Sequence, residues 1–304
     1  MRVANAPCSF GVDEIIVDDA WMPTPDQVLD LIAELDFQGT ELGPPGWMGT
    51  GDKVRAALGR RNLELVGAFL PLHFSRAEKF TADQDWLRES LALLRDATPD
   101  GSRPFAILAD HFDEPVRQAF AGRIPDHPEA ALPPDRFRLL VDNLHRAADI
   151  CRAAGFEPVV HPHAGTYIET HDEVTRVLDA MDPALLGLCL DTGHARFGGS
   201  DPVELVDTFH HLIRHVHAKD CRTAVLDAVA REGKGMEEAL VQGAFVELGS
   251  GDSGIASVVD ALRRHDYGGW LVVEQDRFLF ATDTLETLRE SNRRNRDFLR
   301  GLGI

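Results

Sequence analysis

The sequence predicts a single (β/α)8 barrel, an α/β fold formed by one domain over residues 1–304. Short apolar runs typical of buried strands alternate with helical patterns eight times along the chain. Polar residues close several of these runs, which is where α/β barrels place their functional groups. The composition does not change along the chain, and barrels of this length commonly form one domain.

The eight expected strands are short runs rich in apolar and β-branched residues. Their spacing leaves room for a helix between each pair, as a parallel barrel requires. The expected strands are Val3–Phe10, Gly39–Leu42, Leu65–Leu70, Phe105–Ala109, Pro158–His161, Leu186–Asp191, Arg214–His217 and Trp270–Glu274.

Capping signals mark the starts of several intervening helices. A threonine followed three residues later by Gln or Glu forms a capping box, and proline favours the first helical position. Such signals occur at Thr24 with Pro25 and Gln27, at Thr170 with Glu173, and at Asp201 with Pro202. A longer helix is expected from Pro134 to Ala154, ended by Gly155.

Three segments are longer than a minimal barrel needs, namely Thr98–Arg103, Pro115–Pro134 and Arg222–Gly254. Long loops at the C-terminal face of a barrel usually shape the substrate pocket. The last segment ends in the glycine-rich run Gly249–Gly254, which is interpreted as a pocket-shaping turn. Its backbone amides offer a site for phosphate, so phosphorylated sugars stay open as substrates.

The charge and the cysteines restrict the partners. A formal net charge of −19 disfavours nucleic acid and anionic membranes, and no apolar stretch is long enough to span a bilayer, so a small-molecule substrate is expected. The cysteines Cys8, Cys151, Cys189 and Cys221 are far apart, form no CxxC pair and are interpreted as reduced thiols. Without an export signal, a cytoplasmic location is expected. The oligomeric state, a homo-oligomer included, stays open.

Four potential metal ligands stand at the ends of consecutive strands in the second half of the chain. His161, Asp191, His217 and Glu274 each close an apolar run. Strand ends meet at one face of a barrel, so these nitrogen and carboxylate groups are expected to converge. Such a mixed set suits a divalent metal.

Motifs around these residues resemble the sugar phosphate isomerase/epimerase superfamily with the xylose isomerase-like TIM barrel. Within it, the chain is most similar to the inosose dehydratase branch, whose reaction is the dehydration of 2-keto-myo-inositol. The motifs are His161-Pro162-His163-Ala164-Gly165-Thr166-Tyr167-Ile168-Glu169-Thr170, Leu190-Asp191-Thr192-Gly193-His194, His215-Val216-His217-Ala218-Lys219-Asp220 and Gly268-Gly269-Trp270-Leu271-Val272-Val273-Glu274-Gln275-Asp276.

The resemblance implies a divalent metal held by Glu, Asp, His and Glu from the last four strands. Asp191, His217 and Glu274 match the last three positions, and His161 stands where the first glutamate is expected. His163 is an alternative first ligand, because side chains two residues apart share a strand face. Mn or Co is favoured, and Zn, Fe or Mg is also compatible.

The departure at His161 bears on the reaction. The superfamily's epimerases use two metal-bound glutamates as opposed acid and base groups, whereas this chain has one glutamate and one histidine. A dehydration instead needs one base for the proton α to the ketone and one acid for the departing hydroxyl. Glu274 is the candidate base and ligand, and His194 and His163 are candidate acids.

Further residues are expected around the substrate. Lys219 and Asp220 follow His217 directly and are candidates to bind substrate hydroxyls, whereas His215 is expected to point into the helix layer or pack structurally. Glu41, Asp110 and His73 lie at the ends of other strands, where pocket residues are found.

Three alternatives stay open from the sequence. A metal-dependent sugar or inosose isomerase or epimerase would use the same ligands, and a lyase of 3-keto-glycosides would use nearly the same chemistry on a larger substrate. A barrel that binds a polyol, or partners a catalytic subunit, is the non-enzymatic alternative.

Overall fold

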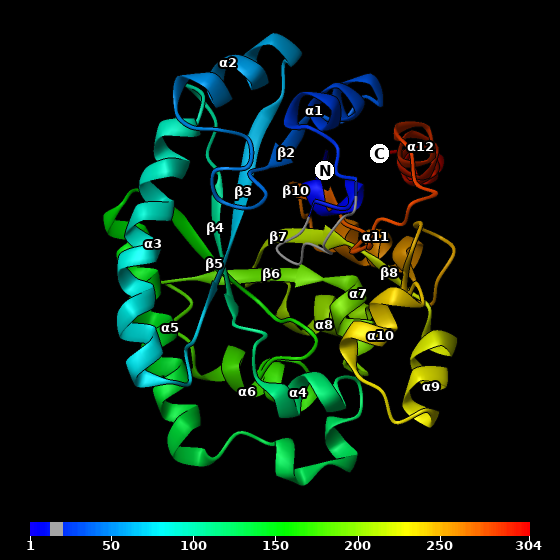
Figure 1. Ribbon diagram of the computed structural model, residues 1–304. Coiled ribbons are helices and arrows are strands. Elements are labelled where there is room, and N and C mark those ends of the chain that lie inside the picture. Colours follow the sequence, from blue (N-terminus) through cyan, green and yellow to red (C-terminus); the bar gives the residue numbers. More distant parts are fainter. Residues whose placement is uncertain (13–20) are drawn as a thin grey trace.

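Eight parallel strands close into a barrel in the computed structural model, which describes residues 1–12 and 21–304 (Figure 1). The predicted (β/α)8 fold is thereby confirmed. Around the barrel the strands follow the order β1-β10-β7-β6-β5-β4-β3-β2. Their bounds are β1 Arg2–Asn5, β2 Gly39–Glu41, β3 Glu64–Leu72, β4 Phe105–Asp110, β5 Glu157–His161, β6 Gly187–Asp191, β7 Ile213–Ala218 and β10 Trp270–Val273.

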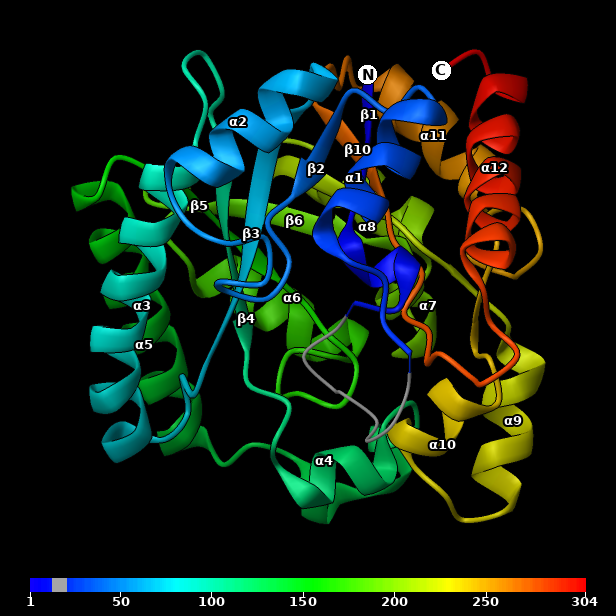
Figure 2. The same cartoon turned by 45° about the horizontal axis from the view of Figure 1, so that its top comes forward.

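Helices surround the barrel, and α12 lies near α11 and the chain's N-terminus (Figure 2). Their bounds are α1 Pro25–Glu34, α2 Asp52–Arg61, α3 Ala77–Ala97, α4 Pro115–Phe120, α5 Pro134–Ala153, α6 His171–Ala180, α7 Thr192–Phe197, α8 Pro202–Phe209, α9 Thr223–Arg231, α10 Met236–Val241, α11 Ile255–Arg264 and α12 Leu285–Gly301. Among the described residues, no helix combines the length and the apolar character that a membrane crossing requires.

The predicted helix starts are confirmed by their hydrogen bonds. Thr24 and Thr170 each form a capping box, and the side chain of Asp201 accepts from the backbone N–H of Val203. Helix α5 ends next to Gly155, which has a φ of +90°, a conformation that residues with a Cβ rarely adopt.

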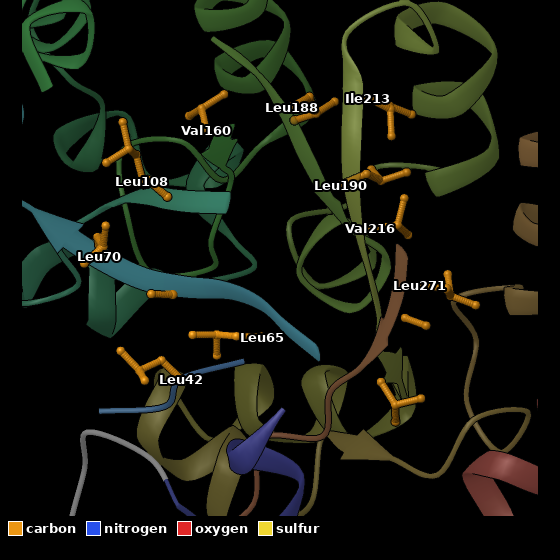
Figure 3. Packing of buried hydrophobic residues seen from close by; sticks show 14 of the residues in the cluster. Leu42, Leu65, Leu70, Leu108, Val160, Leu188, Leu190, Ile213, Val216 and Leu271 are labelled. Atoms are coloured by element: carbon orange, nitrogen blue, oxygen red, sulfur yellow. The ribbon is translucent and has the colours of Figure 1, made fainter. Parts of the chain in front are cut away.

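The two faces of each strand carry different cores. Outward-facing side chains such as Leu108, Val160, Leu190 and Val216 pack in the large cluster shared with the helices (Figure 3). Inward-facing residues form small clusters in the lumen, one of Ala4, Ala6, Val66 and Val272 and the other of Ile107, Val159 and Cys189. Because side chains alternate along a strand, His161 and Asp191 lie on the same inner face as Val159 and Cys189.

Two expectations about local structure were wrong. The run Val3–Phe10 is a strand only to Asn5, and Pro7–Phe10 forms a 3-10 helix. Proline lacks the N–H that a strand ladder uses and fits the first turn of a helix. The segment Thr98–Arg103 precedes β4, so it lies at the opposite end of the barrel from the strand ends that bear the ligands.

The other two long segments lie at the ligand-bearing face, as expected. The first contains α4 and the 3-10 helices Ile124–Asp126 and Pro128–Ala130. The second contains α9, α10 and β9 (Phe245–Val246), which pairs antiparallel with β8 (Asp220–Cys221) just before the segment. Figures 1 and 2 show α10 beside α4 and α9. A separate apolar cluster joins these segments and includes Ala121, Phe197, Met236, Ala239 and Phe245. We call these two segments the cap.

Candidate metal centre and active site

Four side chains from four strand ends meet at the C-terminal face of the barrel. His161 and Asp191 are the last residues of β5 and β6, His217 lies near the end of β7, and Glu274 directly follows β10. All four are buried, and each offers a ligand atom within 4.8 Å of the others. His217 Nδ1 lies 3.1 Å from His161 Nε2 and 3.0 Å from Glu274 Oε2.

The charges of the cluster suit a cation. Burial alone would raise the pKa of Asp191, but Lys219 and His194 beside it hold that pKa well below its usual value. The pKa of Glu274 is likewise lowered, against its burial, by His217 and Lys219. Both carboxylates are therefore ionised at neutral pH, and the buried Oδ2 of Asp191 lies 3.5 Å from His161 Nε2. Two carboxylates and two imidazoles of this kind fit a divalent metal ion.

The end of the strand places the two candidate histidines in different clusters. Strand β5 ends at His161, and the turn that follows lies at Ala164 and Gly165, so His163 lies beyond the strand. His161 belongs to the cluster with Asp191, whereas His163 belongs to a neighbouring cluster with His194 and Asp276. The imidazole Nδ1 of His163 donates to the carbonyl oxygen of Ala164 at 2.7 Å, which leaves Nε2 as an acceptor in the neutral ring.

Glu41 orients the histidine ligand rather than standing alone in the pocket. Its Oε1 lies 2.9 Å from His217 Nε2 and 2.8 Å from His215 Nε2. Because Nε2 of His217 faces this carboxylate, Nδ1 is left to face the other ligands, which is the arrangement of a carboxylate–histidine–metal site. Burial opposes it, but His217 and His215 hold the pKa of Glu41 well below its usual value. Glu41 also lines the cavity described below, where it was expected.

The expectation that His215 points into the helix layer was wrong. His215 lies two residues before His217, and side chains two apart share a strand face, so both point into the lumen. Its ring packs against Phe105 at a centroid distance of 5.0 Å and is completely buried. His215 is thus a structural support for Glu41, in agreement with the other half of that expectation.

A second layer lies above the ligands and follows a simple rule of spacing. Residues two positions beyond three ligands form it, namely His163, Lys219 and Asp276. The residue two positions beyond Asp191 is Gly193, where an added Cβ would lie 2.5 Å from Lys219 Cγ. The missing side chain makes room for the lysine. Sequence reasoning assigned no role to Asp276, although its spacing from Glu274 repeats that of Lys219 from His217.

Lys219 joins the two layers. Its Nζ lies 2.9 Å from Asp276 Oδ2, 3.0 Å from Glu274 Oε2 and 3.2 Å from Asp191 Oδ2. Burial would lower the pKa of this amine, but the three carboxylates raise it well above its usual value. The lysine is therefore an ammonium group at the centre of the site. His194 Nε2 lies 2.9 Å from it.

Asp220 was expected to face the substrate cavity, but it does not line that cavity. Its carboxylate accepts hydrogen bonds from the backbone N–H groups of Gly249, Gly251 and Ser253 at 2.8 to 3.0 Å. The backbone amides that the sequence offered as a phosphate site therefore already donate to a carboxylate of the same chain. A ring of backbone amides of this kind favours any anion. The carboxylate of Asp220 belongs to the same chain, so it occupies the ring without the entropy loss that a free anion would have on binding. An added Cβ at Gly251 would lie 2.5 Å from Asp220 Oδ1, so this contact needs the glycine.

Two further candidates lie outside the cavity. His73 is held by Asp83, at 2.9 Å from Nδ1, and by Asp113, at 3.2 Å from Nε2. Asp110 accepts a hydrogen bond from the backbone N–H of Tyr167 at 3.1 Å and is buried beneath that loop. Both do lie at strand ends, but their polar atoms contact helix α3 and neighbouring loops instead.

Asp110 is expected to make stability depend on pH. Burial raises the pKa of its carboxyl from 3.8 to about 7, so the folded chain favours the protonated form. The resulting stabilisation is complete below the unfolded pKa and is lost as the pH rises through 7. Asp110→Asn keeps an acceptor for Tyr167 but cannot ionise. From pH 5 to pH 8 it should gain on the order of 2–3 kcal/mol in unfolding free energy relative to the unmodified chain. Urea unfolding at both pH values measures this, and a pH-independent difference would contradict it.

A cavity of about 340 Å³ opens above the two layers. Its inner end is lined by residues of the site, namely Glu41, His161, His163, Lys219, Glu274 and Asp276. The cap and the loops after the first strands enclose the rest. His194 is not among the described residues that line the cavity. It lies behind Lys219, which it contacts through Nε2.

Comparisons with known proteins agree with this architecture. Residues 29–300 match the family described as xylose isomerase-like TIM barrel. The chain is 35% identical over 292 residues to an inosose dehydratase of Geobacillus kaustophilus, covering 91% of this chain and 87% of that protein. It is 29% identical over 265 residues to an inosose dehydratase of Bacillus velezensis, covering 85% and 84%.

Solved structures share the fold at lower identity. The IOLI protein, whose structure holds a zinc atom, superposes with a TM-score of 0.72 at 13% identity, over 99% of this chain and 98% of that one. A probable 3-DHS dehydratase of Bacillus anthracis gives 0.67 at 14% identity, over 99% of each chain. Together with the closed barrel and the match along most of its length, these relatives show that the chain belongs to the xylose isomerase-like TIM barrel family and resembles its inosose dehydratase branch most.

Proposed function

We propose that this chain is a metal-dependent hydro-lyase that removes water from a cyclic polyol ketone such as 2-keto-myo-inositol. The observation that carries the proposal is the ligand cluster with His161 in place of a second glutamate, in a chain 35% identical to an inosose dehydratase. The single glutamate of that cluster suits a reaction with one base and a separate acid.

His161, Asp191, His217 and Glu274 are the proposed metal ligands, and Mn or Co is the proposed metal, with Zn, Fe or Mg also compatible. When bound, a divalent ion polarises the ketone and stabilises negative charge on its oxygen. Glu41 holds His217 in the orientation that presents Nδ1 to this position. The proposal further places the reaction in the cytoplasm, with a small molecule as the partner.

Glu274 is the proposed base. Its carboxylate is ionised, lines the inner end of the cavity and lies 3.0 Å from Lys219 Nζ. It would accept the proton from the carbon next to the ketone, so that the C–H electron pair forms an enolate. Loss of the hydroxyl on the next carbon then gives an enol, which becomes the diketone, with water as the other product.

Lys219 is the proposed acid for the departing hydroxyl. Its ammonium lines the cavity, whereas His194, one of the two acids expected from the sequence, lies behind it. His194 and Asp276 hold Nζ at 2.9 Å each and fix its position. His163 lines the cavity with a ring whose Nδ1 proton is committed to Ala164, so Nε2 is suited to accept a substrate hydroxyl proton.

A substrate panel tests the reaction class. The metal-loaded protein is incubated in D2O with 2-keto-myo-inositol, with myo-inositol and with keto-sugars, and the products are identified by NMR. We expect water loss from the ketone and no turnover of myo-inositol, because proton removal requires a carbonyl on the neighbouring carbon. Deuterium incorporation without water loss would favour the isomerase or epimerase alternative. Absence of both would favour a polyol-binding barrel.

His161→Glu tests the meaning of the departure from two glutamates. A carboxylate oxygen can replace an imidazole nitrogen as ligand, so the variant should retain metal. It should lose about tenfold or more in dehydration, since the change alters the charge at the metal and adds a base beside the substrate. Proton exchange without water loss should rise in the variant. Metal content and NMR in D2O measure both. Unchanged dehydration kinetics would contradict this role of His161.

A further inference from the structure

The cavity above the site has two chemically different ends. Its inner end is polar, as described above. Apolar side chains from several elements line the rest, namely Pro7, Val12, Pro44, Phe112, Met236 and Leu240. The wall opposite the polar site therefore favours contact with apolar groups over contact with hydroxyl groups.

The cap supplies the most defined part of this wall. Met236 and Leu240 lie four residues apart on α10, so they project from the same face of the helix. Met236 is 5% exposed and is held in the apolar cluster of the cap. Phe112 faces the cavity from the loop after β4, with its ring stacked on His163 at a centroid distance of 5.6 Å.

Polar groups at the outer part are few among the described residues. Gln118 lines it, but its Nε2 already donates to the carbonyl oxygen of Gly165 at 3.1 Å. Glu237 also lines it and is exposed to solvent at the rim. Neither side chain changes the apolar character of the wall formed by Phe112, Met236 and Leu240.

This apolar wall is less favourable for an unsubstituted substrate than for one that carries an apolar group on the same side of the ring. In a keto-inositol every ring carbon except the ketone carries a hydroxyl. With the ketone at the proposed metal ligands, the hydroxyls near it would meet Lys219, Asp276 and Glu41, and those across the ring would face the apolar wall. A hydroxyl buried there without a partner loses its hydrogen bonds to water, whereas an O-methyl group has no O–H donor to satisfy and adds apolar surface to bury.

We propose that the preferred substrate is a keto-cyclitol that carries an apolar ether substituent, of which O-methyl is the smallest, on the side of the ring away from the ketone. This inference rests on the proposed function and adds the substrate class. An unsubstituted cyclitol could pack the C–H face of its ring on Phe112, but this contact would involve only one side of the apolar wall. Here Met236 and Leu240 on α10, together with Pro7 and Pro44, enclose the other sides.

Turnover of matched substrates tests the inference. The metal-loaded protein is assayed with 2-keto-myo-inositol and with its mono-O-methyl ethers. We expect kcat/KM to be about tenfold higher for at least one ether, from burial of the methyl and relief of the unpaired hydroxyl. Leu240→Asn should reduce this ratio to near one. Val241→Asn is the matched control, because Val241 is the next residue on α10 and is exposed. Phe112→Asn repeats the test from a second element.

Binding separates this inference from the proposed reaction. Calorimetry compares myo-inositol with its mono-O-methyl ethers, which bind without reacting. Tighter binding of an ether without any water loss from the ketones would support the preference and refute the reaction. Dehydration of the plain ketone at least as fast as that of every ether, with the same ratio in Leu240→Asn, would overturn the preference and leave the reaction standing.

Discussion

Replacing Asp191 with asparagine is expected to remove most of the bound metal and to lower kcat/KM by more than about a hundredfold. Changes in residues that merely orient a ligand already cost ten- to hundredfold. Asp191 offers a buried, ionised oxygen to the ligand cluster. The substitution removes that charge, and metal analysis after dialysis together with steady-state kinetics measures the result.

Asparagine is preferred to alanine here because Asp191 has a second role. Its Oδ1 accepts from the backbone N–H of His194 at 2.8 Å and caps helix α7, a bond that the amide oxygen of asparagine can keep. Asp201→Asn is the matched control, since Asp201 caps α8 away from the site. It should leave metal content and activity unchanged. Full metal occupancy in Asp191→Asn would exclude Asp191 as a ligand.

Replacing Lys219 with methionine is expected to lower the rate of water loss by about 10²- to 10⁴-fold, the usual contribution of a positioned proton donor. Methionine keeps much of the side-chain volume in the space beside Gly193. Because Glu274 stays in place as the base, deuterium exchange next to the ketone should persist while water loss falls. NMR in D2O follows both rates in one sample, and metal content should be retained.

Lys234→Met provides the control for Lys219. Lys234 is an exposed lysine of the cap that pairs with Glu232 and Glu238, so its loss should not change either rate. An equal fall of exchange and water loss in Lys219→Met would move the lysine from the departing hydroxyl to the proton-abstraction step. Unchanged kinetics would remove Lys219 from the chemistry altogether.

The sequence by itself determined the barrel and the set of residues at its strand ends. Apolar runs and helix caps such as Thr24 and Thr170 are local signals, and local geometry alone makes the ends of parallel strands meet. Asp191, His217 and Glu274 therefore came together where they were expected. The spacing of two residues that links His217 to Lys219 also relates Glu274 to Asp276, and it was readable in advance.

Only the tertiary structure decided what each neighbouring polar side chain contacts. The end of β5 separated His161 from His163. The carboxylate of Asp220 accepts hydrogen bonds from a loop about thirty residues further along the chain. Glu41 turned from a substrate candidate into the partner of His215 and His217, although more than 170 residues separate them. Hydrogen bonds between distant segments depend on how strands and loops pack, and no periodicity along the chain encodes that packing.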